Sequence, residues 1–307
     1  MKILISNKLH EKGIKILEEN GFEVIKKFSI SQEDLREEIA NYDGIIVRSG
    51  TKIFSEELKR SKNLKVIGRA GVGLDNIDLE EAERLGIKVF NTSKAPSVSV
   101  AELTMGLIIS LLRNITKADK TMHCGDWFKS DYMGSELKGK KIGLIGFGNI
   151  GTEVAKRAAA FDMVVGIYDV DKTVKQKAKE LGYIIYPSVD ELIQESHVIS
   201  LHIPSTVKTE NTINERRLNL MDEDNMIINT ARGNLIDEVA LLKALNEKKI
   251  KGAALDVFRK EPIENMELCN FEGNLILTPH IGSQTVETQV NASVSIAKKV
   301  SDYLKNL

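Results

Sequence analysis

A glycine-rich loop with G-x-G-x-x-G spacing stands between a short apolar run and a predicted helix. The first glycine permits a tight turn, the second lets the backbone approach a pyrophosphate, and the third lets helix and strand pack closely. The helix N-terminus adds unpaired N–H groups and the positive end of its dipole, which favour phosphate. We therefore predict a dinucleotide site here, formed by Gly146, Phe147, Gly148, Asn149, Ile150 and Gly151.

An acidic residue, Asp169, ends the next apolar run, at the distance from the loop that is typical of dinucleotide-binding folds. A carboxylate at this position accepts hydrogen bonds from the adenosine ribose and repels a 2′-phosphate, which favours NAD over NADP. Lys172 follows closely and weakens this preference. The sequence thus predicts NAD as the cofactor and leaves the strictness of the preference open.

An arginine, a glutamate and a histidine each follow a predicted strand in the C-terminal half of the chain: Arg232, Glu261 and His280. Because ligands of open α/β sheets bind beyond the carboxyl ends of the strands, we expect the three side chains at one edge. The imidazole can supply a proton to a carbonyl oxygen, the carboxylate favours the protonated ring, and the guanidinium can hold a substrate carboxylate. Together they suit hydride transfer to a 2-oxo acid, although each alone also fits an ordinary surface residue.

The segments that position these residues alternate between apolar runs and helical patterns, which predicts parallel sheets covered by helices. In the N-terminal third, strands are predicted at 3–5, 24–25, 45–47, 66–67 and 89–90, and helices at 11–20, 32–40 and 79–85. From Lys141 onward, six strands are predicted at 142–145, 164–168, 197–201, 226–229, 253–257 and 275–277. The helices predicted among them lie at 174–181, 189–195, 215–220 and 238–247.

Two further helices are predicted outside these alternating segments. Ser99 and Glu102 have the spacing of a capping box, which would open one long apolar helix from Val100 to about Lys120. A final amphipathic helix, 285–304, has no sheet nearby in sequence to join. Of the remaining histidines, His10 and His123 are expected to be solvated, and His202 is expected to be either structural or beside the cofactor, and not catalytic.

The composition excludes several classes of protein. The 307 residues carry a formal net charge of −1, with 42% hydrophobic and 28% charged residues, which indicates about two globular domains. Without a basic excess, no nucleic-acid partner is predicted. No apolar run reaches membrane-spanning length and no signal peptide is recognised, so we predict a cytoplasmic protein without a membrane partner. The two cysteines, Cys124 and Cys269, lack metal-binding spacing, and no metal site is predicted.

Six ordered motifs resemble those of the NAD-dependent D-2-hydroxyacid dehydrogenases, and within that family the members that act on phosphoglycerate. They are GRAGVGLDNID at 68–78, SVSVAELT at 97–104, the glycine loop, NTARG at 229–233, ALDVF at 254–258 with Glu261-Pro262, and TPHIG at 278–282. The resemblance covers essentially the whole chain. It implies two doubly wound parallel-sheet α/β domains, with a flavodoxin-like substrate domain formed by 1–97 and 285–307 and a Rossmann-type NAD-binding domain at 98–284.

The same resemblance assigns roles to individual residues. It implies that Arg232, Glu261 and His280 are catalytic. It implies additional cofactor contacts, with Asp256 near the nicotinamide carboxamide; the residues are His202, Pro204, Thr209, Thr230, Ala231, Asp256 and Gly282. For the substrate, it implies that Arg48 and Arg69 bind a phosphate, that the amides of Val72 and Gly73 bind the carboxylate, and that Lys129 reaches the phosphate, across a subunit boundary.

The resemblance finally implies a reaction and an assembly. The reaction is oxidation of 3-phospho-D-glycerate to 3-phosphohydroxypyruvate with NAD, the first step of serine biosynthesis, in a homodimer or a dimer of dimers. Two alternatives remain: a reductase of glyoxylate, hydroxypyruvate or another small 2-oxo acid, and an NAD-sensing binding protein similar to transcriptional corepressors. Many phosphoglycerate dehydrogenases have a C-terminal serine-sensing domain, which this sequence lacks, so serine feedback through such a domain is not expected.

Overall fold

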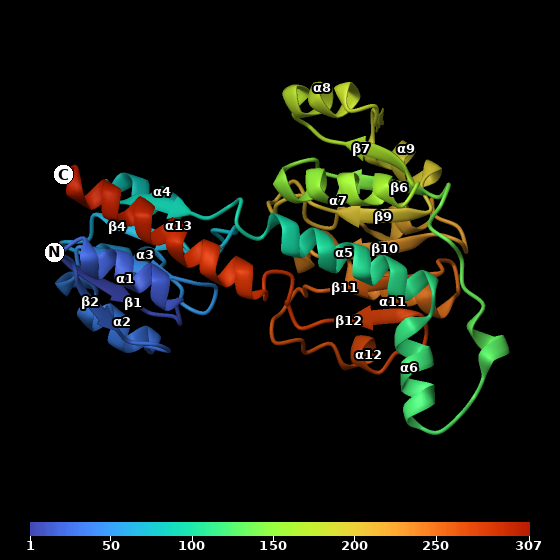
Figure 1. Cartoon of the computed structure of the whole chain (residues 1–307), viewed down its shortest axis with the longest axis horizontal. Helices are drawn as coiled ribbons and strands as arrows, with labels where there is room; N and C mark the ends of the chain where they lie inside the picture. The colour runs from blue at the N-terminus through green and yellow to red at the C-terminus, as the bar shows by residue number, and fades with distance from the viewer. The chain divides into compact units, whose positions relative to one another are not determined.

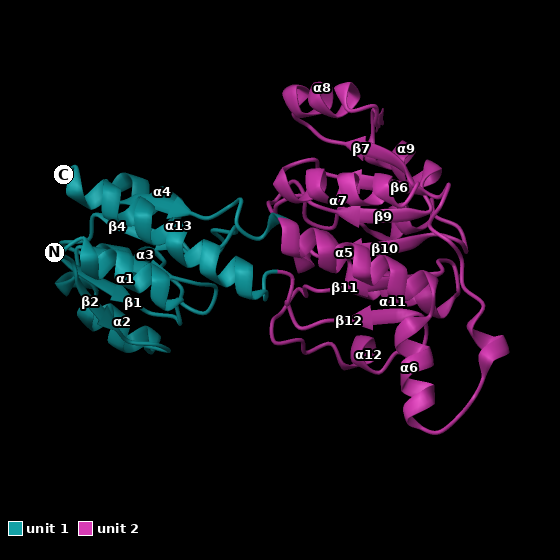
Figure 2. Ribbon diagram, viewed as in Figure 1, with its two compact units in different colours: residues 1–97, 283–307 teal, residues 98–282 magenta.

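The computed structural model describes residues 1–307 and divides them into two compact units. Unit 1 consists of Met1–Ser97 and Ser283–Leu307, and unit 2 consists of Val98–Gly282, as Figure 2 shows in teal and magenta. Each unit has its own sheet. The chain therefore leaves unit 1 after Ser97 and returns to it at Ser283, which lies two residues before the return predicted at 285.

Unit 1 is a five-stranded parallel sheet with the strand order β2-β1-β3-β4-β5, the doubly wound order of flavodoxin-like proteins. Its strands are β1 (Lys2–Ile5), β2 (Glu23–Lys26), β3 (Gly44–Val47), β4 (Val66–Arg69) and β5 (Lys88–Asn91). Its helices are α1 (Glu11–Glu19), α2 (Gln32–Glu38), the 3₁₀ helix η1 (Ile39–Asn41), α3 (Ser55–Arg60), α4 (Leu79–Arg84) and α13 (Val286–Lys305). All five predicted strands are present.

The C-terminal helix α13 packs on the sheet of unit 1 beside α1 (Figure 1). Glycines permit both contacts. A Cβ at Gly68 of β4 would lie 2.7 Å from Val300 Cγ2, and one at Gly13 of α1 would lie 2.5 Å from the Ser293 carbonyl oxygen. His10 takes part in this contact, because its backbone N–H donates to Ser293 Oγ and its Nδ1 caps α1. His10 is therefore half-buried rather than fully solvated, whereas His123 is exposed as predicted.

Unit 2 is a seven-stranded parallel sheet with the order β12-β11-β10-β9-β6-β7-β8. Its strands are β6 (Lys141–Ile145), β7 (Val164–Tyr168), β8 (Ile184–Ile185), β9 (Val198–Leu201), β10 (Met226–Asn229), β11 (Gly252–Leu255) and β12 (Leu275–Leu277). The six predicted strands are present, and β8 is an additional edge strand too short to produce a recognisable apolar run. The strand order reverses between β6 and β9, which makes this a Rossmann-type sheet with its ligand crevice at that point. The predicted α/β fold class is confirmed.

The helices of unit 2 cover the two faces of this sheet. They are α5 (Ser97–Leu112), α6 (Ile115–His123), α7 (Asn149–Ala160), α8 (Lys172–Glu180), α9 (Val189–Glu195), α10 (Glu215–Leu218), α11 (Glu238–Asn246) and α12 (Met266–Cys269), with the 3₁₀ helices η2 (Lys129–Tyr132) and η3 (Gly233–Leu235). The sequence prediction missed α3, α12 and the 3₁₀ helices. Each of them is at most six residues long, which is too short to show a clear helical period.

The predicted continuous helix from Val100 to Lys120 was wrong in three respects. The helix begins earlier, at Ser97, so Ser99 lies inside it, and Glu102 pairs with Arg157 at 3.2 Å. It also ends at Leu112, whose carbonyl accepts the N–H of Ser135 at 3.0 Å in place of a helical N–H. Asn114 then adopts a left-handed conformation with φ of 55°, and α6 follows at an angle of 68°. Within the structure no single helix is long and apolar enough to cross a membrane.

Candidate active site

The chemistry-bearing loops of unit 2 follow strands of one parallel sheet, so they share its carboxyl edge. The glycine loop follows β6, Asp169 follows β7, and His202 follows β9. Three further loops follow the neighbouring strands β10, β11 and β12, and they carry Arg232, Glu261 and His280 in that order. The edge therefore presents the glycine loop and, on loops of three adjacent strands, Arg232, Glu261 and His280.

The glycine loop is closely packed at its first and third glycines and open at its second. Gly146 has φ of 100°, and a Cβ there would lie 2.5 Å from the His202 carbonyl oxygen. A Cβ at Gly151 would lie 2.4 Å from the Gly146 carbonyl oxygen. Gly148 has no neighbouring atom within 4 Å of its Cβ position, and α7 begins directly after it. This arrangement leaves the backbone at Gly148 and the N-terminus of α7 accessible, as a pyrophosphate requires.

Asp169 is fixed against this loop by two backbone amides. Its Oδ2 accepts the N–H of Phe147 at 2.8 Å, and its Oδ1 accepts the N–H of Asp171 at 2.9 Å. A carboxylate has about four acceptor positions, so capacity remains for the two hydroxyls of a ribose. The glycine loop and Asp169 therefore have the geometry that binding of NAD, the predicted cofactor, requires.

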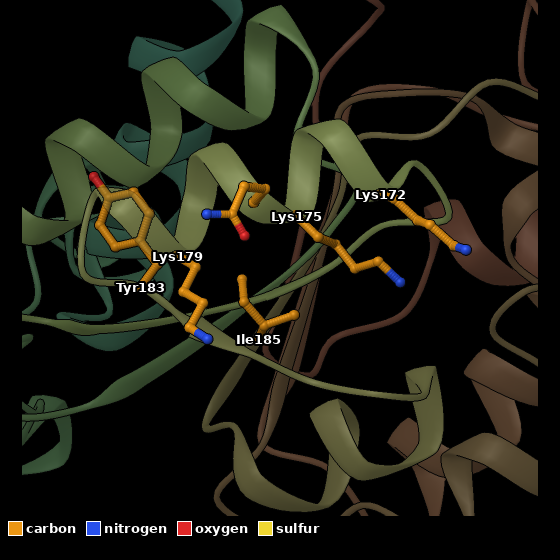
Figure 3. A pocket seen from close by; sticks show the side chains of 6 residues that line it. Lys172, Lys175, Lys179, Tyr183 and Ile185 are labelled. Carbon is orange, nitrogen blue, oxygen red and sulfur yellow. The ribbon is translucent and has the colours of Figure 1, made fainter.

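Lysines gather on α8, directly after Asp169. Lys172, Lys175 and Lys179, together with Gln176, Tyr183 and Ile185, line a surface hollow of about 560 Å³. Figure 3 shows Lys172 and Lys175 extending away from the ring of Tyr183, with their ammonium groups outward. Long lysine side chains commonly cover apolar surface in this way while the charge stays in water.

Glu261 and His280 form the central hydrogen bond of the site. Glu261 Oε2 lies 2.7 Å from His280 Nδ1, and the two side chains are 39% and 43% exposed. The second oxygen, Oε1, accepts the N–H of Phe258 at 3.2 Å. Burial by itself raises the pKa of Glu261, but His280, the Phe258 amide and the charge of Arg232 together lower it below its ordinary value. The carboxylate therefore stays ionised at neutral pH.

Arg232 directly precedes η3, and its loop is fixed by a buried asparagine. Asn229, the last residue of β10, accepts the N–H of Ala231 at 3.1 Å through Oδ1 and donates to the Arg232 carbonyl at 2.9 Å through Nδ2. Arg232 itself donates to the Ala231 carbonyl at 2.6 Å. Sequence analysis noted Asn229 only as part of a motif. The sequence feature that could have identified Asn229 is a polar residue at the end of an otherwise apolar strand.

The Arg232 and Glu261 loops contact each other directly at Gly233. A Cβ at this position would lie 1.9 Å from the carbonyl carbon of Phe258 and 2.1 Å from its oxygen. Only a glycine allows the two backbones to approach so closely. The contact places Arg232 on one side of the junction and the Phe258 amide, which binds Glu261, on the other.

Asp256 holds the loop that carries His280. It is 1% exposed, and its Oδ1 accepts Thr278 Oγ1 at 2.6 Å and the N–H of Ile281 at 2.8 Å, while Oδ2 accepts the N–H of Gly282 at 2.8 Å. His280, with φ of 53°, lies between the residues that Asp256 binds. The resemblance predicted contact with the nicotinamide carboxamide, and that contact remains a prediction. Within the chain, the carboxylate fixes a loop with a left-handed residue at its centre.

Asp256→Asn is expected to loosen this loop. The substitution replaces one acceptor oxygen with an NH₂ group, which would face N–H or O–H donors in a buried place and cost about 1–3 kcal/mol of stability. We expect a lower Tm and a kcat reduced by about tenfold through displacement of His280. Thermal unfolding and steady-state kinetics test this, with the exposed Asp224→Asn as the matched control. An unchanged Tm together with an unchanged kcat would show that the hydrogen bonds of Asp256 do not position the loop.

The other predicted cofactor residues also have internal partners. His202 Nε2 lies 2.9 Å from Ser200 Oγ, and burial lowers the pKa of His202 to about 3, so its ring is neutral at physiological pH. Thr209 Oγ1 donates to the Pro204 carbonyl at 2.7 Å. The buried Thr230 hydroxyl lies 2.9 Å from that of Thr104, whose own hydrogen is donated to the Val100 carbonyl. Thr230 is therefore the donor in this pair, which ties the β10 loop to α5.

The residues predicted to bind substrate, apart from Lys129, belong to unit 1. Arg48 follows β3, and Arg69 ends the neighbouring strand β4. Arg48 is half-buried, and its guanidinium donates to the neutral amide oxygen of Gln289 in α13, so its charge remains available to an anion. Burial without a carboxylate partner lowers the pKa of Arg48, although the group stays charged at neutral pH.

The loop after β4, which contains Val72 and Gly73, is held by the last residue of β5 and the residue after it. Asn91 Nδ2 donates to the Val72 carbonyl at 2.7 Å, and the N–H of Thr92 donates to the Gly71 carbonyl at 2.9 Å. Gly71 has φ of 156°, and the Arg69 guanidinium occupies the place of its missing side chain. These bonds engage the carbonyls of Gly71 and Val72. They do not involve the N–H groups of Val72 and Gly73, which are predicted to bind the substrate carboxylate.

Lys129 is placed apart from the other predicted residues of unit 2. It is exposed in η2, on the long excursion between α6 and β6. In Figure 1 this excursion extends away from the arrowheads of β9 and β12, where the chemistry-bearing loops begin. Within unit 2, therefore, the structure does not bring Lys129 to Arg232, Glu261 and His280.

Comparison with known proteins agrees with this geometry. Residues 105–282 match the family model of the NAD-binding domain of D-isomer specific 2-hydroxyacid dehydrogenases. The chain is 44% identical over 305 residues to D-3-phosphoglycerate dehydrogenase of Methanocaldococcus jannaschii, with 99% of this chain and 58% of that protein covered. It is 42% identical to hydroxypyruvate reductase of Thermotoga maritima, with 88% of each chain covered.

A solved structure is similar throughout its length. D-lactate dehydrogenase of Aquifex aeolicus, in complex with NAD and lactic acid, superposes with a TM-score of 0.85 at 30% identity and covers 99% of this chain and 96% of its own. The curated phosphoglycerate dehydrogenases are longer, and the chain spans 57–58% of the length of three of them. The family match covers more than half of the chain and includes all the unit 2 loops described above. The chain belongs to the D-isomer specific 2-hydroxyacid dehydrogenase family and carries its NAD-binding domain.

Proposed function

We propose that this chain interconverts a D-2-hydroxy acid and its 2-oxo acid. The observation that carries the proposal is the 2.7 Å pair of Glu261 and His280, whose loops follow β11 and β12, beside the Arg232 loop after β10. NAD bound at the glycine loop would accept the hydride from C2 of the hydroxy acid. Because Nδ1 of His280 is engaged with Glu261, Nε2 is the nitrogen that takes the hydroxyl proton. Arg232 binds the substrate carboxylate, with the amides of Val72 and Gly73 as further donors.

We propose 3-phospho-D-glycerate as the substrate, with 3-phosphohydroxypyruvate as the product and serine biosynthesis as the pathway. Arg48 supports this choice because its half-buried guanidinium has a neutral hydrogen-bond partner and suits a phosphate. The similarity to several phosphoglycerate dehydrogenases over nearly the whole chain agrees with it. The proposal includes a preference for NAD through Asp169, a cytoplasmic location, and a homodimer or dimer of dimers in which Lys129 serves the neighbouring subunit.

Reduction of hydroxypyruvate or glyoxylate is the second candidate function. It is supported by the hydroxypyruvate reductase of Thermotoga maritima, which matches at 42% identity and is covered to 88% of its length. The two candidates share the chemistry of Glu261 and His280 and differ in whether the substrate carries a phosphate. Arg48 is thus the residue that separates them.

A panel of 2-oxo acids tests the proposal. Oxidation of NADH is followed with phosphohydroxypyruvate, hydroxypyruvate and glyoxylate, and then repeated with NADPH. We expect the highest kcat/KM with phosphohydroxypyruvate and NADH. A higher kcat/KM with either unphosphorylated acid would replace the first candidate by the second.

Arg48→Ala is expected to act on the phosphorylated substrate only. A hydrogen bond to a charged group contributes about 1.5–3 kcal/mol, which corresponds to a rise of about 10- to 150-fold in KM for phosphohydroxypyruvate. The KM for hydroxypyruvate should change by less than about threefold, since it has no phosphate to lose. The exposed Arg60→Ala, on α3 of the same unit, is the matched control. Equal effects on both acids would contradict the phosphate-binding role.

A further inference from the structure

A buried carboxylate outside the predicted site, Glu238, contacts the loop that carries Glu261. Glu238 lies on α11 and is only 8% exposed. Its Oε1 accepts the N–H of Arg259 at 2.9 Å, and its Oε2 accepts Nδ2 of Asn265 at 3.4 Å. These two partners lie on either side of Glu261 in the sequence. One carboxylate therefore holds the loop before and after the residue that binds His280.

Arg259 adds a second attachment to the same loop. Its Nε donates to the Ile236 carbonyl at 3.2 Å, and its guanidinium contacts the Asn211 side chain and lies 3.7 Å from Glu210. Ile236 stands between η3, which begins next to Arg232, and α11. The backbone amide of Arg259 is thus held by Glu238 and its side chain by the segment that follows Arg232.

The segment from Arg232 to Glu238 connects the contacts of Glu238 to the predicted catalytic residues. The segment begins with Arg232, packs through Gly233 against Phe258, and ends with Glu238, which binds Arg259. The loops of Arg232 and Glu261 are therefore joined at two points, one steric and one polar. We infer that Glu238 is a positioning residue that keeps Glu261 in register with Arg232 and within hydrogen-bond distance of His280. This inference rests on the proposed function, because it assigns Glu238 a part in the same reaction.

The expected effect follows from the sensitivity of catalysis to small displacements. Loss of Glu238 leaves the Arg259 amide and Asn265 without their acceptor, and the loop then shifts or fluctuates. A displacement of about 1 Å at a catalytic group can lower the rate by about 100-fold. Because Glu238 touches neither the glycine loop nor Asp169, cofactor binding should not change.

Glu238→Ala and Glu238→Gln test the inference beside a control on the neighbouring residue. Asp237 caps α11 by accepting the N–H groups of Val239 and Ala240, and its side chain does not bond the Glu261 loop. Asp237→Ala should therefore lower Tm without a matching loss of kcat. Glu238→Ala should lower kcat about 10- to 100-fold, with the KM for NADH unchanged. Glu238→Gln retains one acceptor oxygen for the Arg259 amide and should recover part of that loss.

Amide hydrogen exchange, measured without substrate, separates this inference from the proposed function. The segment 256–266 should exchange faster in Glu238→Ala than in the unsubstituted protein, and Asp237→Ala should not show this change. If the unsubstituted protein turns over none of the 2-oxo acids, the proposed function fails, and exchange alone then decides whether Glu238 positions the loop. Normal exchange in Glu238→Ala, or a kcat loss no larger than in Asp237→Ala, would overturn the inference.

Discussion

His280→Ala should lower kcat by about 100-fold or more while NADH affinity stays within about twofold of the original value. The reason is that the 2.7 Å bond to Glu261 occupies Nδ1 of the imidazole and leaves Nε2 for proton transfer at the substrate oxygen. The cofactor loop and Asp169 do not depend on this ring for their hydrogen bonds. Steady-state kinetics and fluorescence titration with NADH give the two quantities.

His123→Ala is a matched control for this experiment, because His123 is exposed and bonds only within α6. It should leave both kcat and NADH affinity unchanged. If His280→Ala turned over substrate at a near-normal rate, another group would have to transfer the proton. If His280→Ala lost NADH affinity as well, the His280 side chain would contribute to cofactor binding in addition to proton transfer.

Gly233→Ala is expected to produce the second large effect, on both stability and turnover. The added methyl group would lie 1.9 Å from the Phe258 carbonyl carbon, which belongs to the backbone and cannot move aside alone. Separating the two loops should cost at least about 1–3 kcal/mol of stability, the usual range for overpacking. The same movement displaces Arg232 from Glu261 and should reduce kcat by about 100-fold. Thermal unfolding and steady-state kinetics measure the two effects.

Gly148→Ala separates this steric effect from the general loss of a glycine. No atom lies within 4 Å of a Cβ at Gly148, so Tm should not fall. The methyl group would instead stand where a pyrophosphate approaches the backbone, and NADH affinity should decrease. Equal losses of stability in both variants would show that the contact between Gly233 and Phe258 is not the cause.

Much of the site was predictable because it depends on where strands end. Apolar runs identify β10, β11 and β12, and polar residues after parallel strands must meet at one edge. The glycine loop was predictable for a similar reason, since its spacing is a requirement of backbone geometry. These are properties that a few neighbouring residues determine, without knowledge of the rest of the chain.

The remaining features depend on contacts between distant residues. The break after Leu112 combines a local feature, the left-handed Asn114, with a distant one, the bond from the Ser135 N–H to the Leu112 carbonyl, which the residues around Leu112 do not predict. Glu238 looks like an ordinary first-turn residue of a helix, and only the fold brings the Arg259 amide to it. Lys129 was assigned by resemblance alone, and its place on the segment between α6 and β6, away from Arg232, Glu261 and His280, leaves its role a prediction.

The attachment of α13 to unit 1 has a consequence for the order in which the protein is assembled during translation. Ile296, Val300 and Leu304 complete a core that includes Ile3 and Ile5, yet they are synthesised after the whole of unit 2. Residues 1–97 therefore leave the ribosome with this apolar face uncovered, and they must wait until the intervening 185 residues of unit 2 have emerged. Unit 2 has no such dependence, so it can fold first, and the nascent N-terminal sheet is the part most exposed to aggregation or to capture by chaperones.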